Sequence, residues 1–332
     1  MDLLLGITLS YALVKRKILQ LEPMWSFGFG SNMNVANVEK KKGHKVLASA
    51  AGVVHGWKMN FNLRGMAYVE PAFANAMPGN TDENIHGVAI LLSAADVTKL
   101  TNQERGYQKE WVRVHCYDGR LINAFIFTRT VAGDRPFLLE DEQTPSVRYL
   151  NLLINGATSA GLNSAYIERL KTTKTWTPDI ALIKKRRNLP NPTDLPVMTV
   201  NELFTTRSNS SGENPTCEYA FTAIYGYVLR LPRKKIFFSS HHGRDLTARF
   251  SRHFNGISMD NNDDMGKPPF LKLKELASPE AEYIMMWFDY YLAKDPKIVG
   301  YIEEFLTQEP SMSTFLSQVC DIAESKLHVH LH

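Results

Sequence analysis

Alternating apolar and polar positions dominate the chain between Trp25 and Thr130. This period of two, in segments rich in Val, Ile, Leu and Phe, predicts β-strands. One helix is expected among them at SAADVTKLTNQERG, where Ser93 is a suitable N-cap and Leu100 lies at helical spacing from Val97. The expected strands lie in WSFGFG, VLASAAGVVHGWKMNF, MAYVEPAFANAM, HGVAILL, WVRVHCY and LINAFIF.

The pattern changes to helical spacing after Gln143. Apolar residues recur at intervals of three and four in PSVRYLNLLINGATS, which predicts an amphipathic helix. A second helix is expected from about residue 164 to residue 170. These two helices complete a first domain, which we place at residues 24–175.

A connector is expected at residues 176–197, because this stretch contains several prolines and the basic run KKRR, which is typical of a solvated face. A second compact domain is expected at residues 198–306. Its predicted helices lie in TVNELF, RDLTARFSRHF and SPEAEYIMMWFDYYLAK, and its strand-like segment is AFTAIYGYVLRL. Residues 307–332 form a C-terminal tail.

Length and composition support two soluble domains. The 332 residues exceed the size at which one hydrophobic core usually suffices, and 44% hydrophobic with 22% charged residues is ordinary for a globular protein. The 38 Lys and Arg residues nearly balance the 34 Asp and Glu residues, so the net charge of +4 gives no indication of a nucleic-acid partner. The oligomeric state is not encoded in any of these patterns.

The three cysteines are far apart and contain no CxxC pair, so they indicate neither a disulfide framework nor a structural zinc site and favour a reducing, cytoplasmic location. Near the N-terminus, the apolar run from Leu3 to Val14 is shorter than the about 20 residues that span a membrane. We expect residues 1–23 to form a packed or amphipathic helix. The alternative is a weak anchor at a membrane surface, because basic residues follow the run.

No metal site is expected. Residues 261–266 are rich in Asn and Asp but lack the glutamate that completes a calcium loop, so they predict a polar surface loop. The alternating His328, His330 and His332 at the end of the chain could bind a metal only adventitiously.

Two segments carry candidate chemistry. In SFGFGSNMN, glycines follow a short apolar strand, and such a loop can turn its backbone N–H groups toward a carboxylate or carbonyl oxygen. In LTNQERGY, Glu104 could serve as a general base and then a general acid, provided that it lies in a cleft. The alternatives are a tight strand-to-helix turn and a surface glutamate at a helix end.

Together these segments resemble the gamma-glutamylcyclotransferase (AIG2-like) family, which has a YGSN-type loop and a later E-x-G-Y-like or EG-type segment. Here Phe29 replaces the usual tyrosine. The resemblance extends over residues 25–170, through ENIHGVAILLSAADVTKL and the family's PS-x-x-Y segment followed by GA and GL. The family residues in this last part are Pro145, Ser146, Tyr149, Gly156, Ala157, Gly161, Leu162 and Tyr166.

The resemblance implies an α+β fold: a mixed β-barrel with flanking helices. It also implies an intramolecular aminolysis, in which the α-amine of a γ-glutamyl group attacks its own γ-carbonyl and releases 5-oxoproline. Glu104 would be the acid/base residue, and no cofactor is needed. The implied substrate is a small γ-glutamyl amino acid, a peptide such as glutathione, or an amine. The implied substrate-binding residues are Phe29, Gly30, Ser31, Asn32, Met33 and Tyr149, although Tyr149 could equally be a core residue.

The second domain has a weaker resemblance to the cytochrome b5-like fold, carried by VNELF, AIYGYVLRL, GRDLT and KIVGYIEEF. It lacks that family's HPGG segment. Haem binding would need an axial ligand, for which His241, His242 and His253 are candidates by residue type alone. We therefore expect a smaller α+β accessory domain without haem; the alternative function is a haem- or ligand-binding protein whose first domain is catalytically silent.

Overall fold

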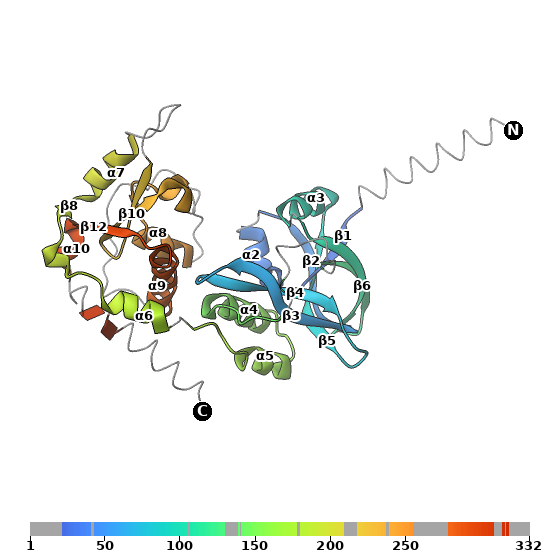
Figure 1. Cartoon of the computed structure of the whole chain (residues 1–332). Coiled ribbons are helices and arrows are strands. Elements are labelled where there is room, and N and C mark those ends of the chain that lie inside the picture. Colours follow the sequence, from blue (N-terminus) through green and yellow to red (C-terminus); the bar gives the residue numbers. More distant parts are fainter. Residues whose placement is uncertain are drawn as a thin grey trace, which may run out of the picture. The chain divides into compact units, whose positions relative to one another are not determined.

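The computed structural model describes residues 22–40, 43–104, 106–129, 139, 141–177, 180–208, 218–236, 239–254, 278–308, 314–315 and 317–318. The chain forms two compact units, one within residues 1–66 and 70–175 and the other within residues 67–69 and 176–332 (Figure 1). The expected N-terminal helix up to residue 21, the Asn- and Asp-rich loop and the terminal histidines lie outside the described residues. Among the described helices, none has the length and apolar character needed to cross a membrane.

The first unit is built on a mixed β-barrel. Five strands form a closed ring in the order β1-β5-β2-β6-β7, because β1 pairs in parallel with β7 as well as antiparallel with β5. The hairpin β3-β4 continues the sheet beyond β7. The strands are β1 (Met24–Gly28), β2 (Val46–His55), β3 (Trp57–Met66), β4 (Glu70–Pro78), β5 (Asn84–Leu92), β6 (Gln108–Cys116) and β7 (Leu121–Thr128).

Buried side chains of the strands fill the interior of the barrel. Along β6, Val112 and Val114 are buried, whereas the alternate residues Trp111 and Arg113 are exposed. Along β2 the same alternation runs from Ala50 to Val54, whereas the last five residues of β7 are all buried. Apolar side chains from these strands fill the barrel, and the strands lie where the sequence predicts them. The long segment VLASAAGVVHGWKMNF differs from a single strand, because Gly56 adopts a left-handed φ of +73° and reverses the chain between β2 and β3.

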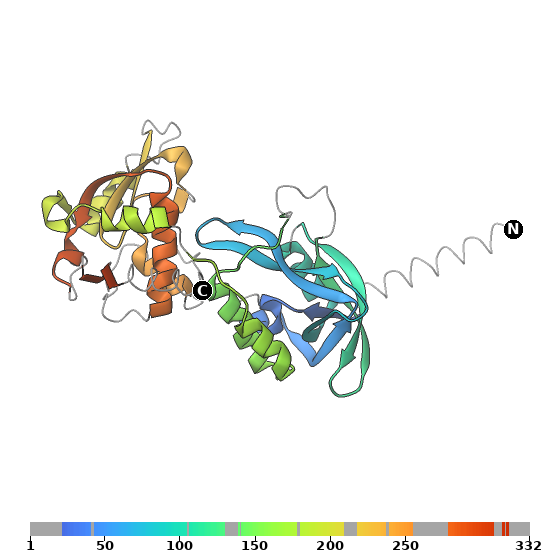
Figure 2. The same ribbon diagram turned by 60° about the horizontal axis from the view of Figure 1, so that its bottom comes forward.

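Helices flank the barrel, with α4 (Val147–Ser159) and α5 (Ser164–Lys171) together on one side of this unit (Figure 2). The predicted cap of α3 (Ala94–Gln103) is confirmed, because the Ser93 hydroxyl accepts the Asp96 N–H at 3.1 Å. The short α2 (Val35–Lys40) follows a 3₁₀ turn, η1 (Ser31–Met33).

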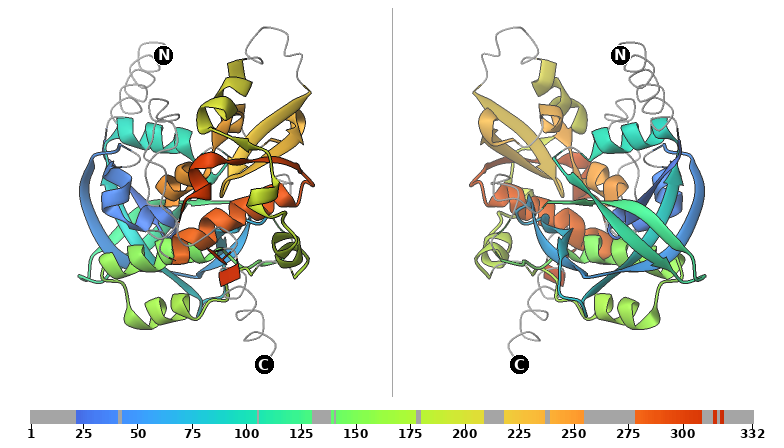
Figure 3. Two further views of the ribbon diagram at one scale, coloured as in Figure 1. Left: turned by 90° about the vertical axis from the view of Figure 1, so that its left-hand side faces the viewer. Right: turned by 90° about the vertical axis from the view of Figure 1, so that its right-hand side faces the viewer.

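The second unit combines a five-stranded sheet, in the order β11-β9-β10-β12-β8, with helices (Figure 3). The predicted strand AFTAIYGYVLRL is a hairpin, because Tyr225 and Gly226 both have positive φ and connect β9 to β10. Its strands are β8 (Val197–Met198), β9 (Tyr219–Ile224), β10 (Tyr227–Pro232), β11 (Arg244–Asp245) and β12 (Lys297–Ile302), and its helices are α6 (Ile180–Arg187), α7 (Val200–Ser208), α8 (Thr247–Phe254), α9 (Ser278–Leu292) and α10 (Glu303–Leu306).

The basic run in the expected connector lies on α6 and is not uniformly solvated. Arg186 is 4% exposed, and its Nε donates to Asp289 of α9 at 2.6 Å, with a second bond from Nη2. Burial raises the pKa of the Asp289 carboxyl, while the Arg186 guanidinium acts in the opposite direction. Lys185 differs, because it pairs with the exposed Asp295. The sequence alone does not show that Arg186 is buried and Lys185 exposed, because Asp289, the partner of Arg186, is about 100 residues away along the chain.

Candidate active site

The loop after β1 packs closely against the last residue of β1, Gly28. A Cβ on Gly28 would lie 2.6 Å from the carbonyl oxygen of Asn32, so only glycine fits there. A Cβ on Gly87 of β5 would in turn overlap the Gly28 carbonyl oxygen. The turn is closed by a hydrogen bond of 3.0 Å from the Met33 N–H to the Gly30 carbonyl. The two glycines therefore fix the position of Asn32.

Glu104 lies at the C-terminal end of α3, where its N–H donates to the Leu100 carbonyl at 2.9 Å. The preceding residue, Gln103, forms a hydrogen bond with the His44 ring, with 2.8 Å between Gln103 Oε1 and His44 Nε2. From the β1 loop, the Asn32 side-chain amide donates to Glu104 Oε1 at 3.2 Å. The Asn32 Oδ1 is buried and has no hydrogen-bond partner among the residues that the structure describes. The two candidate segments, 72 residues apart in sequence, thus meet at one pair of side chains.

A tight turn follows Glu104. The Tyr107 N–H donates to the Glu104 carbonyl at 3.2 Å, and Gly106 between them has a φ of +82°. A Cβ at this position would overlap the guanidinium of Arg129, which lies against the turn. Backbone conformation and close approach both require the glycine of the E-x-G-Y segment. The turn consequently brings Glu104, Tyr107 and Arg129 into one small region.

Tyr149 is positioned by the cap of α4. The Ser146 hydroxyl accepts the Tyr149 N–H at 3.0 Å and donates to the buried Glu70 carboxylate at 2.5 Å, so the serine of PS-x-x-Y orients the tyrosine three residues later. The Tyr149 hydroxyl accepts the Ala74 N–H at 3.3 Å. A Cβ on Gly30 would lie 3.5 Å from this hydroxyl. Tyr149 therefore connects β4 to the loop that carries Asn32.

Arg129 closes a ring of contacts. Its main chain exchanges two hydrogen bonds with the fully buried Asn75 side chain, of 3.0 and 2.8 Å, and its guanidinium carbon lies 4.9 Å from the centroid of the Tyr107 ring. Asn75 follows Ala74, which binds the Tyr149 hydroxyl. The site ring, as we call it, thus consists of Gly30, Asn32, Glu104, Tyr107, Arg129, Asn75, Ala74 and Tyr149.

The tyrosines of the site ring are held neutral. Burial and the nearby Glu104 carboxylate raise the pKa of Tyr107 to about 12, although the Arg129 guanidinium opposes the shift. Burial is also the largest cause of the raised pKa of Tyr149, and the charges of Glu70 and Glu104 act in the same direction. Both hydroxyls are therefore protonated at neutral pH and can donate hydrogen bonds.

Comparisons with known proteins agree on one family. Residues 84–170, which include Glu104, Tyr107, Arg129 and Tyr149, match the model of the AIG2-like family. The gamma-glutamyl cyclotransferase verK of Clonostachys rogersoniana is 30% identical over 150 residues, which cover 39% of this chain and 82% of that protein. The chain belongs to the gamma-glutamyl cyclotransferase family of enzymes.

Other members align over a smaller part of their length. The gamma-glutamyl cyclotransferase gliK of Aspergillus fumigatus is 26% identical over 184 residues, which cover 49% of this chain and 66% of that protein. The chain spans 60% of the related aclK of Aspergillus oryzae. A solved structure titled gamma-glutamyl cyclotransferase aligns with a TM-score of 0.40 at 18% identity, covering 48% of this chain and 94% of that one.

The structure brings together only some of the residues that the family resemblance implied. Gly30, Asn32, Glu104 and Tyr149 belong to the site ring, and Ser31 lies between the first two on the same turn. The side chains of Phe29 and Met33 are 7% and 1% exposed and belong to the hydrophobic core. A role of these two residues in contacting the substrate stays a prediction.

Sequence reasoning missed Tyr107 and Arg129. Tyr107 belongs to the segment LTNQERGY, so its position directly after Gly106 is the feature of the sequence that could have identified it as a site residue. Asn75, which fixes the main chain of Arg129, was likewise not among the predicted site residues. Nothing in the local sequence IFTRT marks Arg129, because its importance comes from a turn more than 20 residues earlier in the chain.

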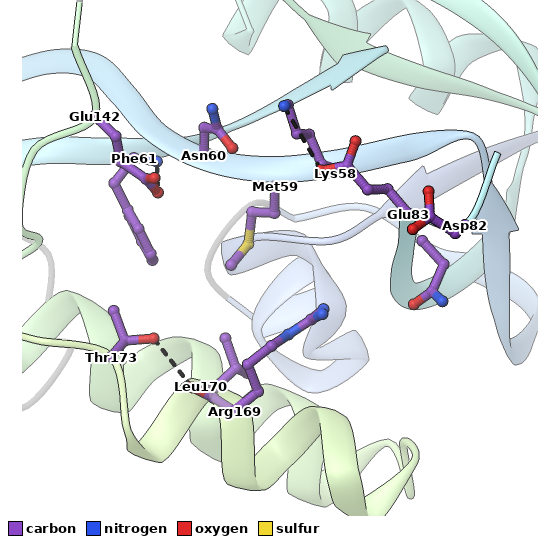
Figure 4. A pocket seen from close by; sticks show the side chains of 11 residues that line it. Lys58, Met59, Asn60, Phe61, Asp82, Glu83, Glu142, Arg169, Leu170 and Thr173 are labelled. Atoms are coloured by element: carbon purple, nitrogen blue, oxygen red, sulfur yellow. Dashed lines mark hydrogen bonds and ion pairs between the residues drawn. The ribbon is translucent and has the colours of Figure 1, made fainter. Parts of the chain in front are cut away.

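Two cavities of the first unit lie away from the site ring. One, of about 340 Å³, is bounded by β3, the turn before β5 and the end of α5 (Figure 4), and charged side chains of both signs, including Lys58, Glu83, Glu142 and Arg169, line it. Lys58 and Glu83 already pair with each other at 3.6 Å. The second, of about 530 Å³, lies beside His86 and Tyr166. Neither cavity includes a residue of the site ring.

The histidines considered as haem ligands are packed among aromatic side chains. The ring of His241 is fully buried against Phe250 and Trp287, and its Nδ1 lies 2.6 Å from the Tyr291 hydroxyl. Burial lowers the pKa of His241 to about 3. His253 contacts the Tyr283 hydroxyl, and His242 contacts Phe221. His241 and His242 are thus buried in the core of the second unit, whereas His253 is only half-buried.

No group of three or more His, Cys, Asp or Glu side chains in the described part of the chain could hold a metal ion.

Proposed function

We propose that this protein is a gamma-glutamyl cyclotransferase that releases 5-oxoproline from a γ-glutamyl amino acid, peptide or amine without a cofactor. The observation that carries the proposal is the hydrogen bond between Asn32 and Glu104, which joins the glycine-rich loop to the candidate acid/base residue. Membership of the gamma-glutamyl cyclotransferase family supports it independently.

The reaction is a ring closure within one molecule. The α-amine nitrogen forms a bond to the γ-carbonyl carbon, the γ-amide C–N bond breaks, and a proton passes to the leaving nitrogen. Because both reacting groups belong to one substrate, a site that holds the reactive conformer gains several kcal/mol through orientation alone. The protein then needs to supply only proton transfer and stabilisation of charge on the carbonyl oxygen.

Glu104 is the proposed proton carrier. Its carboxylate would take a proton from the α-ammonium group and give it to the leaving nitrogen, a role that contributes roughly 10²–10⁴-fold in rate. The buried Asn32 Oδ1 is an acceptor suited to the same ammonium group. Because the amine and the α-carboxylate share one carbon atom, we assign the α-carboxylate to the adjacent turn at Gly30 and Ser31.

Tyr149 is the proposed donor to the substrate carbonyl. Its hydroxyl already accepts the Ala74 N–H and keeps its own proton, because burial raises its pKa. A protonated hydroxyl within the site ring can stabilise the negative charge that develops on the γ-carbonyl oxygen. The short distance between this hydroxyl and Gly30 supports a donor next to the loop that would bind the α-carboxylate.

For the second unit we propose an accessory domain of cytochrome b5-like fold without haem. Its GRDLT segment has a structural role, because Asp245 accepts the N–H and hydroxyl of Thr247 at the start of α8. The purified protein is then expected to show no Soret band, whereas a Soret band would favour the alternative function as a haem protein.

The test is 5-oxoproline release by the purified full chain from γ-glutamyl dipeptides, glutathione and γ-glutamyl amines, measured by mass spectrometry. The proposal predicts equimolar 5-oxoproline and free amine from at least one class, and the best substrate identifies the leaving group. If folded protein releases no 5-oxoproline from any of them, the proposed activity is wrong.

A further inference from the structure

We propose that the cavity of about 340 Å³ beside α5 is a second ligand site, which binds a free α-amino acid with an apolar side chain. The cavity lies between β3, the turn before β5 and the end of α5, and none of its lining residues belongs to the site ring (Figure 4). The inference is therefore independent of the proposed function. Its physical basis is a set of polar side chains that line this cavity and lack partners within the described part of the chain.

Two side-chain amides of this cavity are half-buried and unpaired. Asn60 lies on β3 and Asn84 lies at the start of β5, and neither side chain forms a hydrogen bond with any residue that the structure describes. A side-chain amide has two N–H donors and a carbonyl acceptor. Because an amide that is partly shielded from water gains free energy from a partner, both are suited to bind a polar ligand.

One cation and one anion of the cavity also lack an ionic partner. Lys58 pairs with Glu83 at 3.6 Å between Nζ and Oε1, and the carboxylate of Glu142 accepts a backbone N–H at 3.1 Å. By contrast, Arg169 and Asp82 form no ion pair with each other or with any other described residue. Both are exposed, so the cavity presents one positive and one negative side chain to a ligand that enters from solvent.

Arg169 is oriented to receive a carboxylate. Its guanidinium carbon lies over the ring of Tyr166 on the same helix, 5.2 Å from the ring centroid. Figure 4 shows its side chain extending from α5 into the space between α5 and β3. The N–H donors of a guanidinium lie in its own plane, so contact with the face of a ring leaves them available to the two oxygens of a carboxylate.

A free α-amino acid complements these groups. Its carboxylate matches Arg169 and its ammonium group matches Asp82, while the two amides can bond either of them. The apolar part of the lining, which includes Met59 and Leu170, suits an aliphatic side chain. A ligand with a single charge would leave Arg169 or Asp82 uncompensated. The volume of about 340 Å³ is at the lower end of the range for small-molecule sites, which agrees with a ligand of this size.

The experiment is an NMR titration of the full chain, labelled at its methionine methyl groups, with L-leucine. Met59 lines the cavity, whereas Met33 lies on the loop of the site ring, so their methyl signals report the two locations separately. Met59→Leu and Met33→Leu assign the two signals. The inference predicts a saturable shift of the Met59 signal and none of the Met33 signal. Leucine has no γ-glutamyl group, so the measurement does not depend on turnover.

Two analogues and two variants test the assigned contacts. Leucinamide lacks the carboxylate and isocaproate lacks the ammonium group, and each should bind about tenfold or more weakly than leucine, since a hydrogen bond to a charged group contributes about this factor. Arg169→Met should weaken leucine binding to the level of leucinamide, and Asp82→Asn should weaken it to the level of isocaproate. The matched control is Arg113→Met, an exposed arginine of β6, which should bind leucine as wild type does.

Several outcomes would overturn the inference. One is a Met59 signal that does not move up to the solubility limit of leucine, and another is a shift of Met33 alone, which would place leucine in the candidate active site. Equal affinity for leucine and both analogues, or unchanged affinity in a folded Arg169→Met, would also contradict it. A failure to release 5-oxoproline from any γ-glutamyl substrate would refute the proposed function and leave this second site intact.

Discussion

Glu104→Gln is expected to lower the rate of 5-oxoproline release by roughly 10²–10⁴-fold while the protein stays folded. Glutamine has nearly the same shape and can still bond the Asn32 amide, which lies 3.2 Å from Oε1 in the native site. It cannot accept and return a proton at neutral pH. The expected loss therefore reports proton transfer and not a change of shape.

The matched control is Glu110→Gln, a change of the same kind at an exposed position of β6. We expect it to keep wild-type turnover. Turnover by Glu104→Gln within a few-fold of wild type, with an unchanged melting temperature, would show that another group carries the proton.

Arg186→Met is expected to lower the free energy of unfolding of the second unit by about 3–5 kcal/mol. The substitution leaves Asp289, which is 0% exposed, without the guanidinium that now donates two hydrogen bonds to it. A lone buried carboxylate must either stay charged in an apolar surrounding or take up a proton. Urea denaturation of the full chain, monitored by circular dichroism, measures the effect.

Lys185→Met gives the comparison for a solvated ion pair, because Lys185 is the neighbouring residue on α6 and its partner Asp295 is exposed. Its unfolding midpoint should stay close to that of wild type, since solvent screens such pairs. Similar destabilisation by both variants would show that the buried Arg186–Asp289 pair contributes no more to the free energy of unfolding than the exposed Lys185–Asp295 pair.

The strands and helices of the first unit could be predicted because their apolar positions follow simple periods. Ser93 as a helix cap was likewise visible in the sequence, since a cap needs only neighbouring residues. Reversals inside long apolar runs were harder. Gly56 and the pair Tyr225-Gly226 turn the chain where the hydrophobic pattern continues, and only their backbone conformation reveals it.

The candidate site was predictable only through its motifs. Glu104 and Asn32 were identified from two separate segments, and the structure supplies the contact that connects them. Arg129 and Asn75 could not be identified, because each contributes through a partner on another strand or turn. Their long-range contacts leave no periodic or local signal in the sequence.

The most direct measurement of the central claim is a crystal structure of Glu104→Gln with an intact γ-glutamyl dipeptide bound. The account predicts the γ-glutamyl amine beside Asn32 and the γ-carbonyl oxygen within hydrogen-bond distance of the Tyr149 hydroxyl. Substrate seated instead in the cavity of about 340 Å³ lined by Lys58 and Arg169, with no density in the site ring, would contradict it.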